Sequence, residues 1–158
     1  MTRFFRWPLR RWLALTAYVL GVSVAQAQTV ASTGSLSFGA FVASTGGTIV
    51  VTTGGGRSKT GSVILIAQGG SSAAAQFTVS GTATAVYAIT LPANDTVALS
   101  DGNNHSMALN GFVSSPGATG VLSVGGTQLL RVGATLTVDN AQAPGHYEGT
   151  FPVIVNYN

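Results

Sequence analysis

Residues 145–158 read GHYEGTFPVIVNYN, and from Tyr147 onward one side of an extended chain is almost wholly apolar. Successive side chains of a strand point to opposite faces. One face therefore carries Tyr147, Gly149, Phe151, Val153, Val155 and Tyr157. A regular period of two predicts a strand that is half buried in a sheet. The segment favours a β-rich fold.

The rest of the chain supports the same fold class. After Ala27, short apolar runs alternate with Gly, Ser, Asn and Pro, without helical periodicity. We expect strands over residues 36–42, 48–53, 62–67, 75–81, 86–91, 96–99, 106–113, 120–124, 127–138 and 147–157. Such a series is typical of an all-β, immunoglobulin-like (pilin-like) antiparallel β-sandwich. Because no linker divides residues 28–158, we expect them to form a single β-sandwich domain.

Residues 1–27 are expected to be a cleaved secretory signal peptide. Four arginines precede an apolar run over residues 13–24, and the small residues Ala25 and Ala27 offer a cleavage site. The pair Arg10-Arg11 partly resembles a twin-arginine signal. The general secretory route is preferred, because Leu9 stands where that signal has a serine. We expect no membrane span after cleavage, since the apolar run is short and nothing downstream replaces it.

Removal of this segment changes the charge balance. Arg57, Lys59 and Arg131 remain against four acidic residues, so three minus four gives a net charge of minus one. Both tryptophans are lost as well. Nucleic-acid binding needs a basic stripe or aromatic platforms, so we expect none. Without cysteine, the exported protein depends on packing and hydrogen bonds for its stability.

Two loops have residue types that suggest chemistry. Residues 54–60, GGGRSKT, lack the Gly that precedes the lysine of a phosphate-binding loop, and we expect a solvent-facing hairpin loop. Residues 101–105, DGNNH, carry alternate oxygen ligands but not the glutamate of an EF-hand, and we expect a turn.

Catalytic chemistry has little support in the sequence. His105, His146 and Glu148 have no metal-ligand spacing, and the chain has no Gly-x-Ser-x-Gly motif. An enzyme would need one of these histidines beside an acid in a pocket. We therefore predict a non-enzymatic protein without catalytic, cofactor-binding or metal sites.

The last predicted strand contains a proline, which limits where the strand can lie. Pro152 has no N–H, so we expect a position at a sheet edge or beside an interrupted neighbour. An apolar edge strand promotes aggregation unless another strand pairs with it. The sequence therefore raises the question of what pairs with this edge.

The ending resembles that of chaperone–usher pilins, in which an aromatic residue is penultimate and a glycine is fourteenth from the end. Tyr157 and Gly145 hold these positions here. In that family a periplasmic chaperone pairs with the last strand, and the N-terminal arm of the next subunit later replaces it by β-strand addition, or donor-strand complementation. The resemblance implies that the apolar face of residues 147–157 is an assembly edge. It implies a periplasmic chaperone, an outer-membrane usher and like or related subunits as partners.

The candidate donor residues in the N-terminal arm are Val30, Leu36 and Phe38. A donor arm needs apolar residues at alternate positions. Leu36 and Phe38 meet this need only if they leave the first predicted strand.

From about Leu36 to Asn158, the chain resembles the bacterial family catalogued as domain of unknown function 4402 (DUF4402). The resemblance rests on LSFGAF at 36–41, AQFTVSG at 75–81, YAITLP at 87–92, VGATL at 132–136 and AQAPGHY at 141–147. The chain is also similar to the spore-coat-U-like pilins. These resemblances imply an exported structural subunit of a bacterial surface fimbria or related assembly, with a role in cell adhesion. It would be found in the periplasm and then at the cell surface. The alternative is a self-contained secreted binding module, an adhesin, matrix or glycan-binding protein, that does not polymerise.

Overall fold

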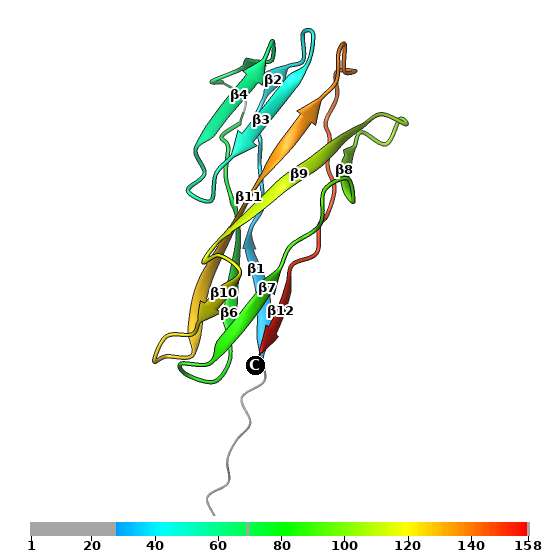
Figure 1. Ribbon diagram of the computed structural model, residues 1–158. Coiled ribbons are helices and arrows are strands. Elements are labelled where there is room, and N and C mark those ends of the chain that lie inside the picture. The colour runs from blue at the N-terminus through cyan, green and yellow to red at the C-terminus, as the bar shows by residue number, and fades with distance from the viewer. Residues whose placement is uncertain (1–27, 69, 158) are drawn as a thin grey trace, which may run out of the picture.

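The computed structural model describes residues 28–68 and 70–157 (Figure 1). These residues contain twelve strands, joined by turns and loops, and no helix. Every strand pair is antiparallel. The predicted all-β, antiparallel β-sandwich is confirmed, and its immunoglobulin-like (pilin-like) character stays a prediction. The predicted signal peptide, residues 1–27, lies outside the described residues.

A seven-stranded sheet is built around one long strand, β11. The strands are β1 (Thr29–Gly34), β3 (Gly47–Val51), β4 (Arg57–Gly61), β6 (Ala75–Ser80), β8 (Val97–Ser100), β9 (Ser106–Ser115) and β11 (Thr127–Val138). One side of β11 pairs with β6 along its first half and with β3 along its second half, and the other side pairs with β9. The outer strands β1, β4 and β8 extend this sheet.

Two smaller groups of strands complete the fold. In the three-stranded sheet, β7 (Val86–Thr90) lies between β10 (Thr119–Val121) and β12 (Ile154–Tyr157). A two-stranded ribbon joins β2 (Phe41–Val42) to β5 (Ile64–Leu65). The ribbon lies near the upper end of the elongated molecule in Figure 1, and β12 lies at the lower end.

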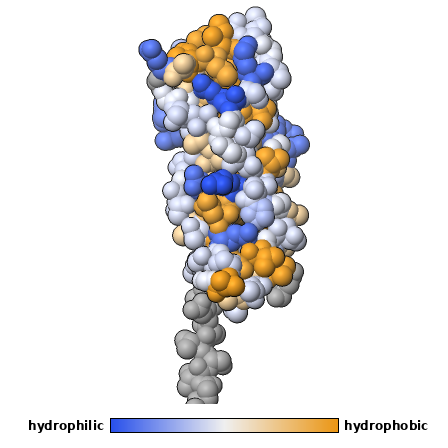
Figure 2. Space-filling view, turned by 90° about the vertical axis from the view of Figure 1, so that its left-hand side faces the viewer, coloured by the Kyte–Doolittle hydropathy of each residue, from blue (hydrophilic) through white to orange (hydrophobic). Residues whose placement is uncertain are grey.

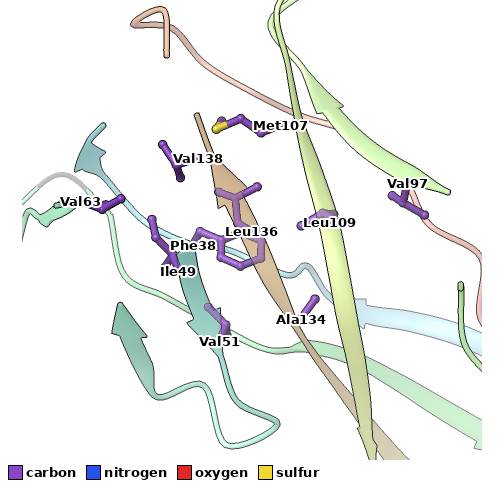
Figure 3. Close-up of a cluster of buried hydrophobic side chains, with 10 residues drawn as sticks. All are labelled: Phe38, Ile49, Val51, Val63, Val97, Met107, Leu109, Ala134, Leu136 and Val138. Carbon is purple, nitrogen blue, oxygen red and sulfur yellow. The ribbon is translucent and has the colours of Figure 1, made fainter. Parts of the chain in front are cut away.

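The core consists of two clusters of buried side chains. The upper cluster gathers around β3, β9 and the second half of β11 (Figure 3) and contains Phe38, Ile49, Val51, Val63, Val97, Met107, Leu109, Ala134, Leu136 and Val138. The lower cluster contains Ala75, Val79, Tyr87, Ile89, Leu122, Leu130 and Val132. Full burial of one large aliphatic side chain contributes about 1.5–3 kcal/mol. Because the chain has no cysteine, these apolar contacts stabilise the fold without disulfide bonds.

The expected loop over residues 54–60 is only partly correct. The glycines form a turn, but Arg57 begins strand β4 and is half-buried. Its guanidinium donates hydrogen bonds to the carbonyl oxygens of Phe38 at 2.7 Å, Ala40 at 3.1 Å and Ile66 at 3.0 Å. Arg57 thus fastens the chain around the β2–β5 ribbon to the large sheet, a role that the sequence pattern did not reveal.

The first and last predicted strands are shorter than expected. In the segment 36–42, Gly39 adopts a φ of +65°, which breaks the extended run and leaves only β2. In the segment 147–157, only β12 pairs with β7, and Ile154 opposite Thr90 is the outermost pair. Continuing this register by two residues places Pro152 opposite Pro92. Because neither proline has an N–H, the ladder ends there.

Candidate assembly edge

Strand β12 forms an open edge of the three-stranded sheet, because it pairs with β7 and with no other described strand. Its side chains alternate as the sequence predicts. Phe151, Val153, Val155 and Tyr157 are half-buried, whereas Pro152, Ile154 and Asn156 are exposed. The apolar face of this edge is therefore directed inward but is not fully covered.

The main-chain groups of β12 are divided between the paired side and the open side. The N–H of Ile89 donates to Ala118 on the β10 side, so the even-numbered residues of β7 face β12. Even-numbered residues of β12 therefore exchange hydrogen bonds with β7. Val155 and Tyr157 direct their N–H and C=O groups toward the open side. Pro152 is even-numbered, so its missing N–H does not interrupt that side.

The chain just before β12 extends the same open side. No described residue accepts a hydrogen bond from the N–H of Phe151 or Val153. These residues share the odd numbering of Val155 and Tyr157. An incoming strand would thus meet apolar side chains and unpaired main-chain groups on the same residues.

Aromatic contacts hold this edge against β6 and β7. The Phe151 ring lies edge-on to Phe77 of β6, with ring centroids 6.3 Å apart, and 5.1 Å from the ring of Phe112. The Tyr157 hydroxyl donates to the carbonyl oxygen of Ser80 at 3.0 Å, and its ring lies 5.7 Å from that of Tyr87. Burial raises the pKa of Tyr157. Burial, followed by the charge of Tyr157, raises the pKa of Tyr87.

The two sheets do not overlap completely in the lower half of the molecule. Strand β12 contacts β6 through Tyr157, and β7 contacts β11 through the Tyr87 hydroxyl, which donates to Gln128 at 2.7 Å. Val30 of β1 lies opposite Val79 and shares its face of the sheet. Val79 is fully buried, but Val30 is 40% exposed. The inward face of β1 is therefore incompletely covered by the other described residues.

The six residues predicted for the assembly edge divide into two groups. Phe151, Val153, Val155 and Tyr157 lie along the open edge. Tyr147 and Gly149 lie instead beside β8, because Glu148 exchanges two main-chain hydrogen bonds with Ser100.

Gly149 lies so close to β8 that an added Cβ would be 2.7 Å from the carbonyl oxygen of Ala98. Residues 147–149 thus cover part of the β8 edge of the large sheet, and the chain then continues into β12, which forms an edge of the three-stranded sheet. The sequence pattern could not separate these two parts, since alternation continues through both.

The three candidate donor residues have different surroundings. Val30 lies in β1 and is exposed. Leu36 is half-buried and contacts both core clusters, and Phe38 is only 6% exposed within the upper cluster. Donation by Leu36 or Phe38 would therefore remove part of the protein's own core, whereas Val30 carries no such cost.

The loop over residues 101–105 is a turn held by its own hydrogen bonds. One Asp101 carboxylate oxygen accepts from the N–H groups of Asn103 and His105, and the other lies 2.7 Å from the His105 ring nitrogen Nδ1. Burial raises the pKa of Asp101, but these hydrogen bonds outweigh burial and lower the pKa to about 2. The carboxylate is thus fully engaged in ordering the turn.

The remaining acid and base candidates do not gather into one site. His146 lies 3.9 Å from Glu148, and both side chains are exposed. Within the described part of the chain, no group of three or more His, Cys, Asp or Glu residues could hold a metal ion. A hollow of about 360 Å³ near Phe112 is lined mainly by apolar residues and contains none of these candidates.

Among the described residues, no helix is long and apolar enough to cross a membrane. The described residues thus form an antiparallel β-sandwich in which β12, an end strand of the smaller sheet, carries half-buried apolar side chains along its open side. The family model described as "Domain of unknown function (DUF4402)" matches residues 28–157, so the chain belongs to that family. No curated protein and no solved structure matches the chain.

Proposed function

We propose that this protein is an exported, non-enzymatic structural subunit of a bacterial surface fimbria or related surface assembly, joined to its neighbours by β-strand addition at β12. The main support is the open side of β12, where the residues with free main-chain groups also carry the half-buried apolar side chains. Strand addition uses both features, since the ladder supplies affinity and alternate side chains supply specificity.

An added strand satisfies two needs of the protein. Each main-chain hydrogen bond contributes about 0.5–1.5 kcal/mol net, so a short ladder contributes several kcal/mol. In this proposal the same strand would also cover Val30 and the half-buried inward side chains of β12. A periplasmic chaperone strand, followed by a subunit strand at the usher, would protect the edge until assembly at the cell surface.

Charge placed on the inward or the outward face of β12 tests this proposal. Val155→Asp directs a carboxylate to the side that the added strand must cover, whereas Ile154→Asp places it on the face that is already exposed. We expect Val155→Asp to be lost from surface assemblies and Ile154→Asp to be retained. Quantitative blotting of surface fractions from the native host gives the amounts, and thermal unfolding of the purified chains checks folding.

A second variant separates assembly from stability. Val30→Asp changes the inward face of β1 and leaves β12 intact. We expect it to fold and to assemble poorly, because the added strand would bury the new charge. Folded Val155→Asp and Val30→Asp chains that reach surface assemblies in wild-type amounts would contradict the proposal.

One observation favours the alternative function, a self-contained secreted binding module. The outward face of the β2–β5 ribbon exposes Val42 at 49%, Ile64 at 56% and Ile66 at 37%, and Figure 2 shows apolar surface near this end of the molecule. This face lies far from β12 in Figure 1. If the protein is a self-contained binding module that uses this face, Val42→Asp would abolish its binding to surfaces, whereas Val155→Asp would not.

A further inference from the structure

Strand β1 is held by its ladder with β6 and by little else. Residues 29–33 are all exposed, and no residue of β1 belongs to either core cluster. Residues Thr29 to Ser32 pair in register with β6, and the register is irregular between Ser32 and Gly34. Displacement of β1 therefore breaks main-chain hydrogen bonds with β6 but removes few apolar side-chain contacts.

The chain after β1 is fixed firmly. Ser37 exchanges main-chain hydrogen bonds of 2.8 and 2.9 Å with Ala73, and Phe38 is buried in the upper cluster. Leu36 contacts both clusters. The change from a loosely held strand to a fixed anchor thus falls at Gly34 and the exposed Ser35.

The edge of β6 needs a strand whenever β1 leaves. The N–H of Gly81 donates to Gly126 on the β11 side, so the even-numbered residues of β6 direct their main-chain groups to β1. Those residues are Gln76, Thr78 and Ser80. An unpaired edge of this kind readily accepts another strand. The structure itself identifies a segment that fits, because residues 29–34 of this sequence occupy the edge in register.

We propose that β1 is exchanged between copies of this protein, so that β1 of one copy pairs with β6 of a second copy. Exchange replaces each ladder by an identical one, which makes it a low-cost route to association. The hinge is Gly34 and Ser35, next to the anchor at Ser37. This second exchange site lies on the opposite sheet from β12 and does not depend on the proposed strand addition there.

Single cysteine substitutions in the exported protein test the exchange. Because the chain has no cysteine of its own, any disulfide must join the introduced cysteines. Ala31 and Thr78 are register partners on the outward face of the sheet. Their hydrogen-bonded pairing places the Cα atoms about 5.5 Å apart, within the range of a disulfide. In a mixture of A31C and T78C chains, cysteines of two different copies lie side by side in register only if β1 has moved to another copy.

The matched control uses Thr48 and Thr60, which are partners in the β3–β4 hairpin and also face outward. Thiols held side by side react at an effective concentration of about millimolar, so at micromolar protein we expect roughly tenfold or more heterodimer from A31C and T78C than from T48C and T60C. The yield should rise with protein concentration. Equal yields from the two mixtures would overturn the proposal.

Two further variants keep the result interpretable. The double variant A31C/T78C should form the disulfide within one chain and lock β1 in place; failure to form it would show that β1 does not occupy this position and would overturn the proposal. Adding Val155→Asp to the single-cysteine chains should leave the heterodimer yield unchanged. Loss of surface assembly with retained exchange thus separates the β12 edge from the β1 site.

Discussion

Replacement of Arg57 by alanine is expected to destabilise the protein by about 3 kcal/mol. The guanidinium donates to three carbonyl oxygens, two of them in part-buried hydrogen bonds to Phe38 and Ala40 and one in an exposed bond to Ile66. A hydrogen bond to a charged group contributes about 1.5–3 kcal/mol, and the lower value suits a half-exposed arginine. Two such bonds give about 3 kcal/mol, with a smaller addition from the exposed bond. Arg57→Lys should recover only part of this, because a single ammonium cannot reproduce the planar fork.

Urea unfolding at neutral pH measures the difference, since a lower midpoint with an unchanged slope reports lost stability. The melting temperature should fall by roughly 10 °C. Lys59→Ala is the matched control, because the second cation of β4 makes one exposed hydrogen bond of 3.4 Å to Gly61. We expect it to change stability by less than about 0.5 kcal/mol. If Arg57→Ala and Lys59→Ala unfold at the same urea concentration, Arg57 does not fasten the ribbon and this reasoning is refuted.

Two other substitutions have defined outcomes. Gly133→Ala should cost about 1–3 kcal/mol, because a Cβ there would meet the carbonyl oxygen of Val51, whereas Gly117→Ala, with no atom within 4 Å of the new Cβ, should be close to neutral in the same urea assay. Asp101→Asn should remove one source of acid sensitivity. The pKa of Asp101 is lowered to about 2, so its contribution to stability is present above pH 4 and is lost as the pH falls toward 2. Unfolding midpoints at pH 6, 4 and 2 should therefore fall less in Asp101→Asn, and equal falls in both proteins would contradict this account.

Much of the fold follows from the spacing of apolar residues. The alternation over residues 127–138 predicts a strand, and this segment is β11, because the alternation is long and no proline interrupts it. The alternation after Tyr147 also predicts which side chains turn inward, since the odd-numbered residues from 151 are half-buried. The pattern could not show where that segment changes sheets, because the change depends on contacts with β8 and on the proline opposite Pro92.

Strands with few apolar residues escape this kind of prediction. In β1, the sequence TVASTG contains little to bury, and β6 supplies the ladder that makes it a strand. In β4, residues 57–60 belong to the loop that the sequence predicts, but pairing with β3 and the Arg57 hydrogen bonds fix them as a strand. Whether these two segments form strands depends on their partner strands β6 and β3, and the residues of β1 and β4 do not identify those partners. The same limit applies to the open edge of β12, since a strand's neighbours are absent from its own sequence.

The two prolines that end the β7–β12 ladder also restrict the register of the last strand. A slip by one residue would turn its apolar side chains outward, and a slip by two would keep the faces correct. A two-residue slip in one direction brings Pro152 opposite Thr90, and in the other it brings Pro92 opposite Ile154. Either slip places a proline at a position whose main-chain N–H would have to donate to the opposite strand, so the β7–β12 ladder loses a hydrogen bond. Pro152 and Pro92 thus penalise both slips that hydrophobicity alone would tolerate, and they favour a single alignment of the chain's final strand.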